Sequence, residues 1–132
     1  METLPLRILP GDDLRAALER AIAARDCEAA FVVAGIGSLA TTRLRLAGSE
    51  EPTVIEGLVE ILTLAGTISP DGVHLHMSVA DANGRVAGGH VAQGCSVRTT
   101  AEVLLVLMRE WTFKRVPDPV TGYPELIVQH KR

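Results

Sequence analysis

The sequence has few aromatic residues and no excess of basic charge. Aromatic residues make up 3% of the 132 residues, which disfavours nucleic-acid binding through base stacking. Lysine and arginine total 13 against 16 aspartates and glutamates, so the formal net charge is −3. The usual electrostatic source of affinity for DNA is therefore missing.

Long apolar runs and export signals are also absent. No stretch approaches the roughly 20 apolar residues of a membrane helix, and the opening METLPLRILPGDD lacks the apolar core of a signal peptide. The two cysteines, Cys27 and Cys95, form no CxxC motif, and we interpret them as reduced, partly buried thiols rather than a disulfide or a catalytic pair. These features predict a cytoplasmic protein with no membrane partner.

Apolar residues make up 47% of the chain, and their spacing predicts two main helices. Between residues 14 and 25 they recur every three or four positions after Asp12 or Asp13, either of which can cap a helix. Thr99 and Glu102 match a capping box, and the following AEVLLVLMRE is apolar on nearly every side. We therefore expect a second helix there, covered by the sheet and by another subunit.

The remaining apolar segments predict strands that follow one another in the middle of the chain. We expect a single α+β domain over residues 1–132, with a mostly antiparallel sheet of about seven strands and two main helices. Residues 53–68 form the longest strand-like segment, and residues 124–129 can close the sheet as a last strand.

Three of the four histidines, His74, His76 and His90, flank one turn sequence. His74 and His76 are two apart, so on a strand they share a face. A two-residue turn at Asn83-Gly84 would send His90 to the opposite face. A three-residue turn with Gly84 in a left-handed conformation would instead set His76 directly opposite His90. The predicted site depends on which of these two registers forms.

Three neutral imidazoles with an open position are typical of a catalytic zinc site, whereas structural zinc sites close with four protein ligands. Iron, nickel or copper also accept imidazole, so we expect a divalent metal, with zinc first and iron or nickel as alternatives. Histidines bonded only to water or backbone, or acting in metal-free proton transfer, are the competing interpretations. Glu60 stands in an apolar stretch, either as an exposed strand residue or as a buried carboxylate that needs a partner.

Several segments together resemble the PPC domain (plants and prokaryotes conserved), in the prokaryotic type that stands alone without an AT-hook. They cover roughly residues 6–129 and read GIGSL from Gly35, EILTLAGTI from Glu60, HLHMSVAD from His74, GRVAGGH from Gly84, TTAE from Thr99 and TGYPEL from Thr121. The resemblance implies an α+β fold, a homotrimer, and a metal site on His74, His76 and His90.

The resemblance leaves three functions open. The first is a trimeric module that binds metal, and with it a small-molecule ligand, in regulation or sensing. The second is a metal-dependent lyase, by analogy with the similar fold of acetolactate decarboxylase, with Glu60 as acid–base and Arg115 or Arg98 as an anion clamp. The third is a DNA-binding regulator, as in plant members. Direct DNA binding is disfavoured because the Arg-Gly-Arg-Pro hook is absent and Leu58 replaces an arginine of the plant pattern.

Overall fold

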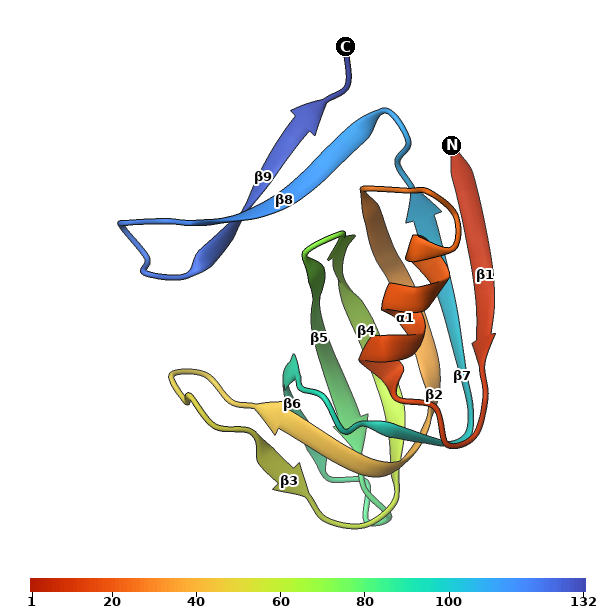
Figure 1. The fold of residues 1–132 in the computed structure, drawn as a ribbon. Coiled ribbons are helices and arrows are strands. Elements are labelled where there is room, and N and C mark those ends of the chain that lie inside the picture. Colours follow the sequence, from red (N-terminus) through yellow and green to blue (C-terminus); the bar gives the residue numbers. More distant parts are fainter.

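The computed structural model describes all 132 residues and contains one helix and nine strands (Figure 1). In chain order they are β1 (Glu2–Ile8), α1 (Leu14–Ala23), β2 (Ala30–Arg45), β3 (Thr53–Ile55), β4 (Val59–Ser69), β5 (Gly72–Ala80), β6 (Val86–Val91), β7 (Ser96–Leu107), β8 (Trp111–Pro117) and β9 (Pro124–His130).

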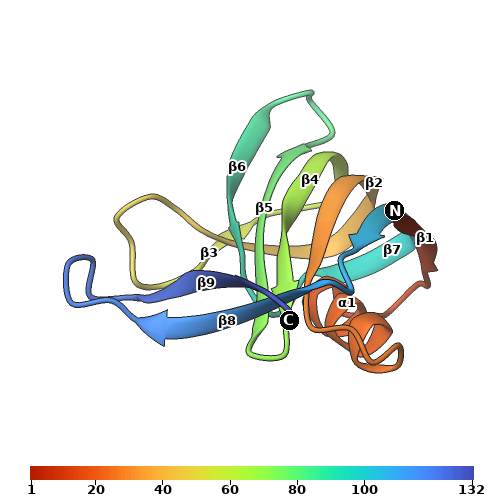
Figure 2. The ribbon, with the colours of Figure 1, turned by 90° about the horizontal axis from the view of Figure 1, so that it is seen from above.

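A seven-stranded antiparallel sheet forms the body of the molecule. Its order is β1-β7-β2-β4-β5-β6, and β3 pairs with β2 off this path. The 16-residue strand β2 also pairs with β6, where Leu44 and Arg45 face Val91 and His90. This extra pairing curls the sheet strongly, as the view from above shows (Figure 2). The curl brings two strands that are far apart in the sequence alongside each other.

Helix α1 lies against one face of the sheet and buries Leu14, Leu18 and Ile22 there (Figure 1). Its N-cap is Asp13, whose carboxylate accepts a hydrogen bond from the amide of Ala16 at 3.0 Å, as the sequence predicts. One cluster of 24 buried residues forms the core between helix and sheet. No helix of the structure has the length and apolar character needed to cross a bilayer.

The second predicted helix is wrong, because the segment after Thr99 belongs to strand β7. Thr99 does not cap a helix; its hydroxyl lies 2.7 Å from that of Ser38 on β2. From Ala101 the side chains alternate between buried and exposed, a period of two that only a strand produces. Leu104 lies on the exposed face, so both faces of the strand are apolar and the alternation is hidden in the sequence.

Two strand predictions also need correction. Residues 53–68 are not one strand, because the chain leaves the sheet between β3 and β4 at Gly57, which has a positive φ of 84°. The last strand, β9, does not close the main sheet but pairs with β8 alone. Together β8 and β9 form a separate hairpin that projects from the body beside the β4–β5 turn (Figure 1).

Candidate metal centre

The turn between β5 and β6 has the three-residue form. The amide of Asp81 donates to the carbonyl of Arg85 at 2.9 Å, and the amide of Gly84 donates to the carbonyl of Asp81 at 3.0 Å. Gly84 has φ 75°, the left-handed conformation that this turn needs. The Asp81 carboxylate does not pair with the guanidinium of Arg85 but accepts hydrogen bonds from the amides of Asn83 and Arg85. His76 consequently stands directly opposite His90, as the three-residue turn predicts.

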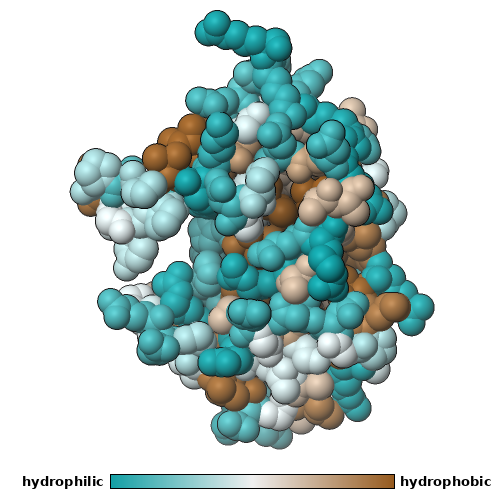
Figure 3. Space-filling view, in the orientation of Figure 1, coloured by the Kyte–Doolittle hydropathy of each residue, from teal (hydrophilic) through white to brown (hydrophobic).

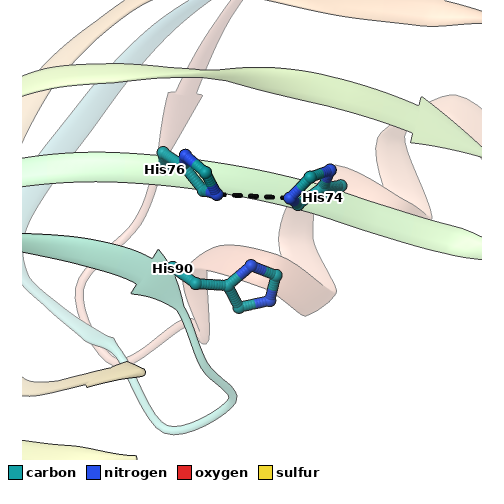
Figure 4. A group of neighbouring side chains, drawn as sticks. All are labelled: His74, His76 and His90. Atoms are coloured by element: carbon teal, nitrogen blue, oxygen red, sulfur yellow. Dashed lines mark hydrogen bonds between the residues drawn. The ribbon is translucent and has the colours of Figure 1, made fainter. Parts of the chain in front are cut away.

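The three histidines meet on one face of the sheet, where β5 carries His74 and His76 and β6 carries His90 (Figure 4). One ring nitrogen from each lies within 4.8 Å of the others. The Nε2 atoms of His74 and His76 are 3.2 Å apart. Imidazole nitrogens that bind a tetrahedral zinc ion at about 2.0–2.1 Å are themselves separated by roughly 3.4 Å. The spacing therefore fits a divalent ion held by three imidazoles.

The hydrogen bonds of His90 fit the same conclusion. Its Nε2 lies 3.4 Å from Nη1 of Arg15, while its buried Nδ1 has no hydrogen-bond partner. Figure 4 shows one nitrogen of this ring turned toward His74 and His76. Burying a ring nitrogen without a hydrogen-bond partner costs free energy, and a metal ion bound to Nδ1 would remove that cost. Arg15 would then keep its hydrogen bonds to the carbonyls of Val91 and Val73.

Half-buried arginines surround the histidines. Arg45 is the cross-strand neighbour of His90 on β2, so the two side chains share a face of the sheet. Burial, followed by the positive charge of Arg45, lowers the pKa of His90 to about 4. Burial, followed by the charge of Arg115, lowers the pKa of His74 below its usual range. Both imidazoles are therefore neutral near pH 7, which is the form that binds a metal.

The structure brings Arg115 to the histidines from the β8–β9 hairpin. Its Nη2 donates to the hydroxyl of Thr67 at 2.9 Å, and Thr67 lies opposite His74 in the β4–β5 pairing. The backbone amide of Arg115 donates to Asp71 at 2.8 Å, which fixes the hairpin to the turn between β4 and β5. Arg115 therefore lines the same hollow as His74.

Glu60 and Arg98 do not join this site. Glu60 is exposed on β4 and pairs with Ala80, four positions along β5 from His76, or roughly 13 Å at the rise of a strand. Arg98 is exposed on β7 and lines none of the hollows beside the histidines. The catalytic role predicted for Glu60 remains a prediction, and the geometry offers it no contact with the metal centre.

Sequence reasoning missed Arg15 and Arg45. Arg45 alternates with apolar neighbours on β2 and looks like an ordinary exposed strand residue, and Arg15 lies on the polar side of α1. Nothing in the sequence around either residue indicates that it lies beside His90. Only the pairing of β2 with β6 and the packing of α1 bring them to His90.

Comparison with known proteins places the chain in a family. Residues 1–108 match the sequence model described as the Plants and Prokaryotes Conserved (PCC) domain, the same family as the PPC domain that the sequence resembles. The chain belongs to this family. The match ends before β8, so the hairpin that carries Arg115 lies outside the matched residues.

Solved structures share the fold. A hypothetical protein from Salmonella superposes with a TM-score of 0.95 at 36% identity, over 99% of this chain and 95% of that one. A PPC protein from Pyrococcus horikoshii gives a TM-score of 0.76 at 26% identity, over 94% and 90% of the two chains. A metal-containing protein from Archaeoglobus fulgidus gives 0.82 at 24% identity, over 96% and 94%. At that identity the last likeness concerns the fold alone.

Among curated proteins, similarity extends to much longer chains. The Bifunctional protein GlmU of Synechococcus sp. (strain JA-3-3Ab) is 47% identical over 129 residues, which cover 98% of this chain and 21% of that protein. The GlmU of Synechococcus sp. (strain JA-2-3B'a(2-13)) is 46% identical, over 98% of this chain and 20% of that protein. The chain therefore spans about a fifth of the length of these relatives.

Proposed function

We propose that this PPC-domain protein binds one divalent metal ion per chain on His74, His76 and His90, and that it acts as a metal- and ligand-responsive regulatory module. The observation that carries the proposal is the convergence of three imidazole nitrogens within 4.8 Å. Three protein ligands leave a coordination position open for a small ligand. Zinc is the first candidate because it favours nitrogen ligands and low coordination numbers, and iron or nickel are the alternatives.

The long curated relatives support the idea of a module. Nearly the whole chain matches a fifth of each of them, so the same fold is used there as one part of a larger protein. A domain that reports metal or ligand state is useful both alone and attached to another activity. We place the protein in the cytoplasm, where its buried and free thiols, Cys27 and Cys95, stay reduced.

The proposed assembly is a homotrimer built on the outer face of the sheet. Ile36 and Leu104 are 56% and 38% exposed there and line an apolar hollow of about 270 Å³ together with Pro5 and Ala34. An exposed apolar patch of this kind is typical of a protein–protein interface. The resemblance of the sequence to PPC proteins, which implies a homotrimer, supports further copies of this chain as the partner.

Metal analysis tests the proposal directly. Protein purified without a nickel column and incubated with zinc is expected to hold about one ion per chain, measured by plasma mass spectrometry after gel filtration. The His76→Ala variant is expected to hold none, because two imidazoles rarely retain zinc. The matched control is His130→Ala, since His130 lies on β9 and contacts Trp111 rather than the site. Equal metal content in wild type and His76→Ala would overturn the proposal.

A metal-dependent lyase is the second candidate, favoured by the hollow of about 580 Å³ that His74, His90 and Arg115 line. The metal would polarise a carbonyl or carboxylate oxygen. A panel of small keto acids, assayed for carbon dioxide release by zinc-loaded wild type and His76→Ala, tests this alternative. Carbon dioxide release by the wild type but not by His76→Ala would establish that the protein is an enzyme.

A DNA-binding regulator is the third and weakest candidate. A candidate DNA-binding protein from Bacteroides thetaiotaomicron shares the fold at 20% identity, with a TM-score of 0.81 over 98% of this chain and 93% of that one. The net charge of −3 argues against DNA as the partner. DNA affinity that falls steeply with added salt would favour this candidate.

A further inference from the structure

A hollow of about 580 Å³ opens beside the histidines, between the β8–β9 hairpin and the loop that joins β2 to β3. Figure 3 shows it as the notch between two projections at the edge of the molecule. The residues of most chemical interest that line it are Arg45, His74, His90, Arg115, Tyr123 and Glu125. The hollow is large enough for a small organic molecule and too polar for an apolar one.

Two arginines line this hollow without a carboxylate partner, Arg45 from β2 and Arg115 from β8. The guanidinium of Arg45 donates only to the carbonyl of Ser49, at 3.3 Å, and that of Arg115 donates only to the hydroxyl of Thr67. The two ion pairs of the structure lie elsewhere, at Arg109–Glu2 and Lys131–Glu28. Each guanidinium has five N–H donors, so most donors of both residues are free for an anion.

Each of the two acidic residues around the hollow accepts one local hydrogen bond. Asp71 accepts from the backbone amide of Arg115 at 2.8 Å, and Glu125 accepts from the hydroxyl of Thr121 at 3.1 Å. Neither carboxylate bonds to a guanidinium. Two half-buried cations that line one hollow repel each other, and an anion bound to both would offset that repulsion.

We propose that this hollow binds a small organic oxyanion, a carboxylate or a phosphate, with its acidic group held between Arg45 and Arg115. Guanidinium groups bind both oxyanions through paired, charge-assisted hydrogen bonds. The same molecule then lies beside His74 and His90, so a second oxygen can reach the position that three imidazoles leave open. This last step rests on the proposed metal site, whereas the arginine clamp does not.

The hollow combines two parts of the chain. Arg115, Tyr123 and Glu125 lie on or between β8 and β9, beyond residues 1–108 that match the family model. The histidines and Arg45 lie within the matched residues. One arginine of the proposed clamp therefore comes from the main sheet and the other from the hairpin.

Calorimetric titration of the full chain with inorganic phosphate and with malonate tests the clamp, and malonamide serves as the uncharged control. The chain is titrated after dialysis against chelator and again after zinc loading. We expect saturable binding of phosphate or malonate to the metal-free chain, with a Kd of about 1 mM or tighter, and no binding of malonamide. Which oxyanion binds more tightly distinguishes a phosphate ligand from a carboxylate ligand.

Substitutions assign the binding to the two arginines. Arg45→Gln and Arg115→Gln are each expected to weaken it about tenfold or more, the size of one lost charge-assisted hydrogen bond. Arg115→Lys keeps the charge but loses the paired hydrogen bonds of a guanidinium. Its affinity for the oxyanion is expected to lie between those of wild type and Arg115→Gln. The matched control Arg98→Gln is expected to bind as wild type does. Circular dichroism confirms that each variant is folded.

The proposed clamp would be overturned if neither oxyanion bound saturably. It would also be overturned if neither Arg45→Gln nor Arg115→Gln weakened the binding. His76→Ala separates the clamp from the metal site. It is expected to lose zinc and keep the oxyanion binding of the metal-free chain. A chain that binds no metal but binds oxyanions through the arginines would refute the proposed metal site and leave the clamp standing.

Discussion

His76 and His90 face each other directly across strands β5 and β6, and the turn at Asp81 sets this relationship. A strand has a period of two, so moving the register by one residue would turn His90 to the other face. The three-residue turn is therefore as important to the candidate site as the histidines themselves.

Insertion of one glycine between Gly88 and Gly89 tests this dependence. It keeps the turn but moves His90 one position along β6, opposite Leu75 instead of His76 and so onto the other face of the sheet. We expect zinc binding to disappear. The check is the metal content of the variant after gel filtration, and full zinc occupancy would show that the register does not set the site.

Deletion of Ala82 is the control. It leaves a two-residue turn at Asn83-Gly84 with Asp81 still opposite Arg85, so the register is kept and zinc should bind normally.

Gly66 supports the site from the neighbouring strand. It has φ 155° and pairs with Leu75, and a Cβ there would overlap the carbonyl oxygen of His74. Gly66→Ala is therefore expected to lower the free energy of unfolding by about 2–3 kcal/mol and to weaken zinc binding by moving the backbone of His74. Urea denaturation and zinc titration measure the two effects.

Gly122→Ala is the matched control for Gly66→Ala. Gly122 has a positive φ of 77°, but nothing lies within 4 Å of a Cβ placed there. Its substitution should cost only about 1–2 kcal/mol of backbone strain and leave zinc binding unchanged. Equal effects of the two alanines on zinc binding would argue that the close approach to His74 is unimportant.

Leu104→Glu tests the proposed trimer. Leu104 is 38% exposed in the single chain, so a glutamate there can reach water, but it would be buried between subunits in the trimer. We expect the mass in solution to fall from three chains to one, measured by light scattering. Val120→Glu is the control, because Val120 is 91% exposed at the tip of the hairpin and should not affect assembly. A wild-type chain that is already monomeric would refute the proposal.

The pairing of Glu2 with Arg109 predicts a small dependence of stability on pH. Arg109 donates to both carboxylate oxygens, at 2.6 and 3.0 Å, and this hydrogen bonding lowers the pKa of Glu2 below 4.5. A carboxyl whose pKa is lower in the folded state stabilises the fold above its unfolded pKa, and this contribution is lost as the pH falls through the folded value.

Glu2→Gln should therefore lower the urea midpoint slightly near neutral pH and have no effect at about pH 2, where both chains carry a neutral side chain at this position. The effect stays small because both partners are exposed. Glu51→Gln is the control, since Glu51 forms no ion pair. A midpoint difference that persists unchanged at low pH would contradict the explanation.

Local signals were enough to predict much of the fold and of the histidine cluster. Asp13 and the apolar spacing after it predicted α1, and the two-residue spacing of His74 and His76 placed both on one face. Gly84 allowed the three-residue turn that the structure shows, but the sequence left the two-residue turn open as well. The second helix was wrong because apolar residues on both faces of β7 hide the alternation of a strand, which becomes visible only once burial is known.

The sequence by itself determined that His74 and His76 share one face, because this depends only on the period of a strand. The structure decided the turn that brings His90 to the same face. The tertiary structure decided what surrounds them. Arg45 reaches His90 because β2 curls round to pair with β6, and Arg115 arrives on a hairpin outside the main sheet. Contacts of this kind join residues that are distant in the chain, and no local pattern encodes them. The residues of the candidate metal site were therefore predictable from the sequence, whereas the register that aligns them and the position of Arg45 beside them depend on the fold.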